Sequence, residues 1–314
     1  MFHGMMTINK EAGYTSSDVV ARLRGILHMK KIGHTGTLDP DAEGVLPVCL
    51  GNGTKLCDLI ADRDKEYTAV MHLGTVTDTQ DMSGSVIRQI SDGEVRERVT
   101  EEALREAVSE FTGTISQIPP MYSAVKVNGK RLYQLAREGK TVERAARQIE
   151  IYELEILGID LPRVTMRVRC SKGTYIRTLC HDIGEKLGTG AAMEHLVRTR
   201  VGNFTLSRSL TLDEAEKIMK SDAPERIGAY ILPVDEFFDS APKAHVREEG
   251  MRYLLNGNTV KRSLTDLALS RVPGPGSGAK DRYVRMYDGD GKFYALYEYK
   301  NSGDELRCVK MFLS

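Results

Sequence analysis

Residues 33–47 read GHTGTLDPDAEGVLP and form the most informative stretch of the chain. Its three glycines permit backbone conformations that other residues avoid, and its two prolines stiffen the chain. We therefore expect a rigid loop that presents His34 and Asp39. The loop does not end in Gly-Lys-Ser/Thr, so a phosphate-binding P-loop is not predicted. From these residues alone, a well-formed turn with Asp39 as a cap explains the stretch equally well.

The composition is typical of a globular protein, with 28% charged and 41% hydrophobic residues in a chain of 314. This length suits one large domain and one small one. No apolar run approaches the ~18–20 residues that would span a membrane. The N-terminal residues have neither the basic start nor the long apolar stretch of a signal peptide. We expect a cytoplasmic protein that does not associate with membranes.

The cysteines and histidines do not indicate a metal site or a disulfide framework. The five cysteines are odd in number, and no C-x-x-C pair occurs among them. The histidines show no spacing typical of metal ligands, and no G-x-G-x-x-G follows a predicted strand. We expect reduced, mostly buried thiols, no metal and no nucleotide cofactor.

The formal net charge is zero, but the basic residues are unevenly distributed. Residues 19–38, 126–147 and 162–177 are rich in Lys and Arg with few or no acids, whereas acids gather elsewhere, as in residues 92–110. A solvated face explains any one of these runs. Because three of them flank the candidate loop and the residues that accompany it, we expect a phosphate-binding surface.

The hydrophobic pattern predicts a mixture of strands and helices in irregular order. Strands are expected at residues 66–74 and 164–170, the second with a basic face. Helices are expected after Ser16 or Ser17, after Thr100, over residues 175–187, and after a capping box of Thr211 and Glu214. The irregular order favours an α+β fold with a mixed sheet over a doubly wound nucleotide-binding fold.

Two segments stand apart from this core. Residues 117–149 begin with a Pro-Pro pair and are basic, which predicts an excursion from the sheet. Residues 271–281 predict a flexible loop, followed by a hairpin around Asp288-Gly289-Asp290-Gly291. We expect a large domain over residues 1–235 and a small β-rich domain over residues 236–314.

Residues 33–47 resemble the signature of the tRNA pseudouridine synthase B (TruB) family, G-H-T-G-x-L-D-P-x-A-x-G-x-L-P, at every fixed position. Two further blocks agree in order and spacing: KEY at residues 65–67 with TDTQDMSG at 77–84, and SKGTYIRTL at 171–179. Residues 117–134 resemble the RNA-gripping insertion of this family. The resemblance extends over residues 4–314. One departure is Asn9-Lys10-Glu11, where the family usually has Asp-Lys-Pro.

The resemblance implies a pseudouridine-synthase fold, with a mainly antiparallel sheet and a PUA-like C-terminal domain. It implies a stand-alone enzyme of the bacterial type that isomerises one uridine in the T-loop of tRNA. The uracil leaves the sugar, rotates and rejoins it through C5, without redox change or energy input, so no cofactor is expected. The expected partner is the T-arm stem-loop of tRNA, with no obligate protein partner, and the enzyme is expected to be a monomer.

The resemblance also assigns roles to individual residues. Asp39 is the central carboxylate, acting as nucleophile or base, and Arg177 holds it ionised and oriented. Tyr67 stacks on the flipped base near C5, an interaction of ~1–3 kcal/mol. The remaining residues are expected to contact RNA: Tyr175 and Leu196 in the base pocket, His34 in the gap left by the base, and Lys126, Lys130 and Arg131 on the insertion.

Three other functions compete with this one. A guide-RNA-dependent pseudouridine synthase shares the motifs but lacks the basic insertion. A non-catalytic RNA chaperone would not need the set Asp39, Tyr67 and Arg177. A glycosidase would need an acid partner, and no motif supports Asp41 or Glu43 in that role. In the C-terminal domain, four residues either contact RNA backbone or are plain surface charge: Lys261, Arg262, Arg282 and Arg285.

Overall fold

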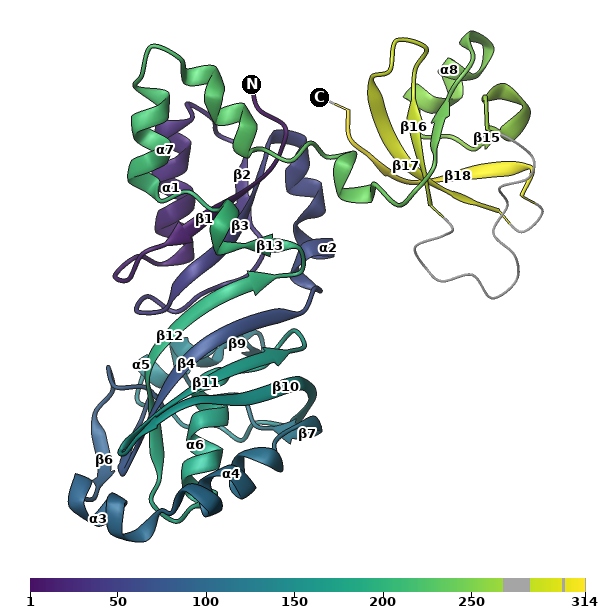
Figure 1. The fold of residues 1–314 in the computed structure, drawn as a ribbon. Helices are drawn as coiled ribbons and strands as arrows, with labels where there is room; N and C mark the ends of the chain where they lie inside the picture. Colours follow the sequence, from purple (N-terminus) through teal and green to yellow (C-terminus); the bar gives the residue numbers. More distant parts are fainter. Residues whose placement is uncertain (268–282, 301–302, 314) are drawn as a thin grey trace.

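The computed structural model describes residues 1–267, 283–300 and 303–313, so the flexible loop predicted at 271–281 lies outside the described residues. Two main sheets organise the chain (Figure 1). A nine-stranded sheet is formed by strands between Gly4 and Thr205, and a five-stranded sheet by strands between Lys243 and Met311. The predicted α+β class is confirmed.

The nine-stranded sheet has the order β1-β3-β12-β4-β11-β10-β7, with β2 paired to β3 and β13 to β12. Its pairs are antiparallel except β3 with β12, which makes the sheet mixed but mainly antiparallel, as predicted. The strands are β1 (Gly4–Lys10), β2 (Ile32–His34), β3 (Glu43–Leu50), β4 (Lys65–Leu73), β7 (Gly113–Gln117), β10 (Arg147–Asp160), β11 (Arg163–Cys170), β12 (Ala191–Val201) and β13 (Phe204–Thr205).

The parallel pair β3–β12 is short, and we call it the seam. It consists of Glu43 opposite Val197 and Gly44 opposite Arg198. Gly44 has a φ of +103°, and a Cβ atom there would lie 2.3 Å from the carbonyl oxygen of Arg198. Glycine is therefore required for the two strands to approach each other. The seam joins the β1–β3 half of the sheet to the half that contains β4, β10 and β11.

Separate groups of helices cover the two halves (Figure 1). Helices α1 (Ser16–Ile26) and α7 (Leu212–Met219) share an apolar cluster with β1 and β3. On the other half, α3 (Asp92–Arg98), α4 (Glu101–Ser109) and α6 (Ile176–Lys186) share one with β4, β10, β11 and β12. Each half thus has its own core.

Two of the predicted helix caps are confirmed, and one is wrong. Thr100 caps α4, and Thr211 forms the predicted capping box with Glu214 at the start of α7. Helix α1 is capped by Thr15, in a capping box with Asp18, so the prediction of Ser16 or Ser17 is wrong. Ser16 is buried, and its hydroxyl bonds the Leu38 backbone.

Short elements complete the large domain. The predicted excursion between β7 and β10 carries a two-stranded hairpin of β8 (Lys126–Val127) and β9 (Lys130–Arg131), followed by α5 (Leu132–Arg137). A second hairpin joins β5 (Thr75–Thr77) to β6 (Val86–Gln89). The other short elements are η1 (Gly51–Leu56), α2 (Cys57–Ala61), η2 (Leu206–Arg208), η3 (Pro224–Tyr230) and η4 (Glu236–Phe238).

The C-terminal sheet has the order β14-β16-β17-β18-β15, and β16–β17 is the predicted hairpin. Its elements are β14 (Lys243–His245), α8 (Glu248–Leu255), β15 (Val260–Lys261), η5 (Arg262–Leu264), β16 (Tyr283–Tyr287), β17 (Phe293–Tyr299) and β18 (Glu305–Met311).

The C-terminal sheet is attached to the large domain through η1. Asn52 donates from Nδ2 to the carbonyl oxygen of Phe312 at 2.6 Å, and Lys55 donates from Nζ to that of Met311 at 2.8 Å. The Phe312 ring is buried in an apolar cluster that also contains Met5 and Val45 of the large domain. In the described part of the chain, no helix is long and apolar enough to cross a membrane.

Candidate active site

The loop that carries Asp39 connects β2 to β3 and is held from behind by the N-terminal segment. The Nζ atom of Lys10, which is fully buried, donates to the carbonyl oxygen of Pro40 at 2.8 Å. The same oxygen accepts the backbone N–H of Gly13 at 3.0 Å. The Ser16 hydroxyl accepts the N–H of Leu38 at 2.9 Å. These bonds fix the backbone on both sides of Asp39, as expected of a rigid loop.

The carboxylate of Asp39 is gripped side-on by Arg177, which lies in the first turn of α6. Nε of Arg177 is 3.0 Å from Oδ2 of Asp39, and Nη2 is 3.4 Å from Oδ1. The arginine side chain is 6% exposed, whereas that of Asp39 is 40% exposed. The carboxylate is therefore oriented by a buried cation but remains accessible to a reactant.

The remaining donors of Arg177 are bonded as well. Nη1 lies 3.3 Å from Oδ2 of Asp81 and donates to the carbonyl oxygen of Thr79 at 3.1 Å. Nη2 donates to the carbonyl oxygen of Tyr122, in the excursion, at 3.0 Å. Arg177 thus connects the Asp39 loop, the loop after β5 and the base of the excursion.

Burial of the Asp39 carboxyl raises its pKa above the ordinary value for aspartate. The Arg177 cation opposes this rise, and the nearby Asp81 carboxylate adds to it. The charge of Asp39 therefore depends on the balance between burial and Asp81, which favour the neutral acid, and Arg177, which favours the carboxylate.

Tyr67 lies on β4, opposite Arg198 of β12, and is 8% exposed. Burial raises the pKa of Tyr67 to about 12, and the Arg198 guanidinium is the largest opposing influence. Leu196, two positions before Arg198, is buried in the same core as Tyr67 and Leu38. Tyr175 caps α6, and its backbone N–H and C=O both bond the amide of Gln117. Tyr67 and Leu196 thus share the apolar core of Leu38, which precedes Asp39, and Tyr175 lies two residues before Arg177.

His34 lies on β2, at the start of the Asp39 loop, and is partly buried. Burial, and then the positive charge of Arg198, lowers the pKa of His34, so its ring is uncharged at neutral pH. Its Nδ1 atom is buried without a hydrogen-bond partner in the part of the chain that the structure describes. An uncharged ring suits the predicted insertion among bases.

The basic residues of the excursion do not join the Asp39 cluster. Lys126, Lys130 and Arg131 are exposed on β8 and β9. Nζ of Lys130 is 3.6 Å from Oε1 of Glu138, and Arg131 lies over the ring of Tyr133, 5.9 Å from its centroid. They form a separate exposed surface, linked to the site through the Tyr122 carbonyl bonded by Arg177.

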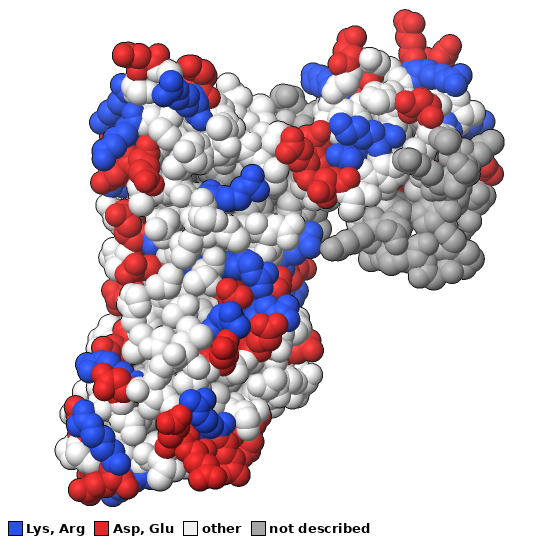
Figure 2. Space-filling model, in the orientation of Figure 1, with Lys and Arg blue, Asp and Glu red and all other residues white. Residues whose placement is uncertain are grey.

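The third basic run does not form a positive surface. Its side chains pair with acids: Arg163 with Glu194, Arg167 with Glu155, Arg169 with Glu153 and Lys172 with Asp62. The register of β10 and β11 places Glu153 opposite Arg169, and Glu155 opposite Arg167. Figure 2 accordingly shows blue and red side chains intermixed over these strands. The phosphate-binding surface stays a prediction for this run, whose exposed cations would have to exchange these acid partners for phosphates.

Two of the four C-terminal candidates are buried and structural. Arg285 donates to the carbonyl oxygens of Ala241 and Asp239, at 2.9 and 3.1 Å. Arg262 is 5% exposed and bonds backbone carbonyls of its own domain. Arg262 and Arg285 are therefore not available to RNA. Of the other two candidates, Lys261 is exposed and Arg282 lies outside the described residues.

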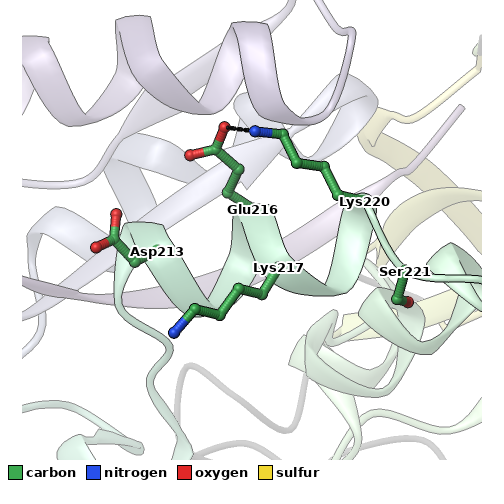
Figure 3. A pocket seen from close by; sticks show the side chains of 5 residues that line it. All are labelled: Asp213, Glu216, Lys217, Lys220 and Ser221. Carbon is green, nitrogen blue, oxygen red and sulfur yellow. Dashed lines mark ion pairs between the residues drawn. The ribbon is translucent and has the colours of Figure 1, made fainter.

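A hollow of about 330 Å³ on the surface of α7 contains none of the residues around Asp39 (Figure 3). It is lined by Asp213, Glu216, Lys217, Lys220 and Ser221, and Glu216 pairs with Lys220 at 2.6 Å. Within the described residues, no group of three or more His, Cys, Asp or Glu side chains could hold a metal ion. All five cysteines are free, and three are buried.

Sequence reasoning missed two charged residues near Asp39. Asp81 lies in the matched block at 77–84, but no role follows from its place there. Arg198 is 2% exposed on β12, and the one available signal was an arginine two positions after Leu196.

Comparisons with known proteins identify the family of this chain. Residues 24–176 match the model described as "TruB family pseudouridylate synthase (N terminal domain)", and residues 177–239 match the "tRNA pseudouridylate synthase B C-terminal domain". A "tRNA pseudouridine synthase B" of Lachnoclostridium phytofermentans is 47% identical, covering 99% of this chain and 100% of the relative. The chain belongs to the TruB family. A second relative of the same name, from Clostridium novyi, is 43% identical over the same shares of the two chains.

Solved structures related to this TruB family member include a chain of the "Crystal Structure of a Cbf5-Nop10-Gar1 Complex". That chain aligns with a TM-score of 0.69 and 28% identity, covering 99% of this chain and 85% of its own length. A chain of an H/ACA RNP bound to a substrate RNA aligns with a TM-score of 0.68 and 25% identity, covering 99% and 86%. The predicted pseudouridine-synthase core and PUA-like C-terminal sheet are confirmed.

Proposed function

We propose that this chain is a tRNA pseudouridine synthase that isomerises one uridine of the T-loop. The observation that carries the proposal is the Asp39 carboxylate, held by the buried Arg177 but open on one side. Tyr67 and Leu196 lie in the apolar core that also contains Leu38, the residue before Asp39. The names of relatives that match over their full length support tRNA as the substrate.

The proposed reaction requires the uridine to leave its stack, because the target atoms are inaccessible in a folded loop. His34, uncharged at the edge of the site, fills the vacated space. Asp39 then acts as nucleophile or base while the bond from N1 to the sugar breaks and the bond from C5 forms. The proton on C5 is lost and N1 gains one. Since atoms and electrons balance without a co-reactant, no cofactor is required.

We infer that the protein acts directly on the T-arm, as a monomer in the cytoplasm, without a guide RNA or obligate partner. The exposed cations Lys126, Lys130 and Arg131 support direct gripping of RNA. Identity of 43–47% to tRNA pseudouridine synthases B, against 28% to a chain of the Cbf5 complex, favours this over the guide-dependent alternative. We place the domain boundary near residue 235, between the two sheets.

A purely RNA-binding function does not account for the site. Binding would gain nothing from a carboxylate held beside a base pocket, since that charge repels phosphate. RNA folding by the same surface is compatible with catalysis but does not replace it.

The test is incubation of the purified protein with an unmodified tRNA transcript and, separately, with a T-arm stem-loop. Pseudouridine is then mapped by sequencing after chemical modification. We expect one pseudouridine, in the T-loop, in both RNAs. Modification that requires an added guide RNA or protein overturns the stand-alone assignment, and no modification under any condition overturns the enzyme assignment.

A further inference from the structure

Arg198 is placed between the two parts of the candidate site. It lies near the C-terminal end of β12, with Tyr67 of β4 opposite it on one side and Gly44 of β3, at the seam, on the other. Its side chain is among the largest that are fully buried. Both catalytic candidates, the Asp39 loop and Tyr67, therefore lie next to this one residue.

The guanidinium of Arg198 contacts the Asp39 loop through its backbone. Nε donates to the carbonyl oxygen of Val45 at 2.7 Å. Nη1 and Nη2 approach the carbonyl oxygens of Thr37 and Gly36, each at 3.5 Å. These three oxygens come from both arms of the loop. Arg198 and Tyr67 lie opposite each other across β12 and β4, and the positive charge of Arg198 opposes the rise in the pKa of Tyr67 that burial causes.

Arg198 differs from Arg177 in lacking a carboxylate partner. Arg177 is paired with Asp39 and Asp81, whereas no ion pair of Arg198 occurs among the described residues. A buried cation that is not neutralised by an acid is costly to the fold. Burial lowers the pKa of Lys65, and the positive charge of Arg198 lowers it further. These costs indicate that the charge at this position serves the reaction and not stability.

We propose that Arg198 is a positioning residue that holds the Tyr67 oxygen in place relative to the Asp39 loop and faces it with a positive charge while that oxygen accepts the C5 proton. The inference rests on the proposed function. In this step the Tyr67 phenol releases its proton to water, and the phenolate takes the proton from C5 of the rejoined base. N1 of the base takes up a proton from water, so protons and charge balance.

The step requires Tyr67 to lose its phenolic proton although burial disfavours the charged phenolate. Burial raises the pKa of Tyr67 to about 12, so the phenolate is scarce at neutral pH. Among the influences on Tyr67, Arg198 is the largest that favours the phenolate, whereas Cys170 and Asp39 oppose it. Without Arg198, both the population of the phenolate and its orientation should decline, and removal of the C5 proton should become the slow step.

The test compares Arg198→Gln, Arg198→Lys and Arg200→Gln. Gln removes the positive charge. Lys keeps a positive charge but lacks the planar guanidinium that contacts three carbonyl oxygens. Arg200 is the matched control, because it lies on the same strand but pairs with Asp64 and Glu66. Each variant is given a T-arm stem-loop carrying either uridine or 5-deuterouridine. Single-turnover rates, the dissociation constant and near-ultraviolet circular dichroism are measured.

For Arg198→Gln we expect a rate about 10²-fold below wild type, typical of misplaced catalytic groups, with a larger deuterium isotope effect and unchanged RNA affinity. Arg198→Lys should lose less rate but also show a raised isotope effect, and Arg200→Gln should match wild type. If the Gln variant does not fold, the Lys variant decides the question.

An isotope effect equal to that of wild type in every folded Arg198 variant, whatever the rate, overturns the role in C5 proton removal. Wild-type protein that makes no pseudouridine overturns the proposed function instead, which keeps the two failures distinct.

Discussion

The Asp39 carboxylate is held in one orientation by Arg177 and yet remains open to solvent on its other side. The carboxylate is held by Nε and Nη2 of Arg177, and the other arginine contacts, to Asp81, Thr79 and Tyr122, keep the guanidinium from turning. A side-on pair of this kind is geometrically specific as well as strong. In the proposed function the open side of Asp39 receives the sugar and base, so substitutions here should affect chemistry more than binding.

Replacement of Asp39 by Asn should reduce turnover by about 10²–10⁴-fold or more, because an amide can act neither as nucleophile nor as base. The dissociation constant for tRNA should hardly change, since binding depends on many phosphate and shape contacts. Single-turnover assays and filter binding on one transcript measure both quantities. Turnover close to wild type would exclude Asp39 as the catalytic carboxylate.

Replacement of Asp81 by Asn should move the acid limb of the pH–rate profile to lower pH. Burial raises the pKa of Asp39, and Asp81 raises it further, so activity falls as pH drops through a value above the usual aspartate range. Without the Asp81 charge, Asp39 stays ionised to lower pH. The plateau rate should also fall, because Arg177 loses a contact. Asp41→Asn is the graded control, since Asp41 influences Asp39 less and should shift the limb less. A limb that moves upward in Asp81→Asn contradicts this account.

The sequence predicts the residues of the site better than the network that supports them. Asp39, Tyr67 and Arg177 follow from the motif blocks, and the structure places Asp39 and Arg177 in contact. Arg198 and Asp81 could not be predicted from these blocks, because their contacts depend on which strands and loops become neighbours in the fold. A buried arginine and an exposed one have the same letter in a sequence. Only the register of β12 against β4 distinguishes Arg198 from Arg200.

At the scale of elements, two basic segments that look alike in sequence behave differently. Arg167 and Arg169 of β11 lie opposite glutamates of β10, whereas β8 and β9 present their cations on an exposed hairpin. The existence and alternation of β11 were predictable from its period of two. Its pairing partner was not, because cross-strand register is a tertiary property.

Replacement of Lys126, Lys130 and Arg131 by Ala should weaken tRNA binding. The slope of log affinity against log salt concentration should become shallower by about one to three units. Fewer counterions are released when fewer phosphates are contacted. The pairing of Lys130 with Glu138 should make its share the smallest. Titrations at several salt concentrations measure the slope.

The matched control for the triple variant replaces Arg163, Arg167 and Lys172, which are exposed but paired with acids. This control should keep the wild-type slope. Equal slopes for wild type and the insertion variant would show that RNA binds elsewhere.

At the scale of the whole molecule, the C-terminal sheet is attached through an apolar cluster that contains Phe312. Its ring is 4% exposed between the two domains. Phe312→Ala should lower the free energy of unfolding by about 3–5 kcal/mol, the usual effect of removing a core phenylalanine. Val309→Ala, on the exposed side of β18, should change it by less than about 0.5 kcal/mol. Urea denaturation measures both, and equal stability of the two variants would show that Phe312 does not attach the domain.

The seam has a consequence for the order in which the chain gains structure. Each half of the large sheet has its own core, but the seam pairs residues 43 and 44 with residues 197 and 198. Contacts so distant along the chain form slowly, because a long loop must close first. The Asp39 loop and Tyr67 meet only where the seam has closed. During refolding from urea, catalytic activity should therefore recover later than the far-ultraviolet signal of secondary structure, and simultaneous recovery would contradict this order.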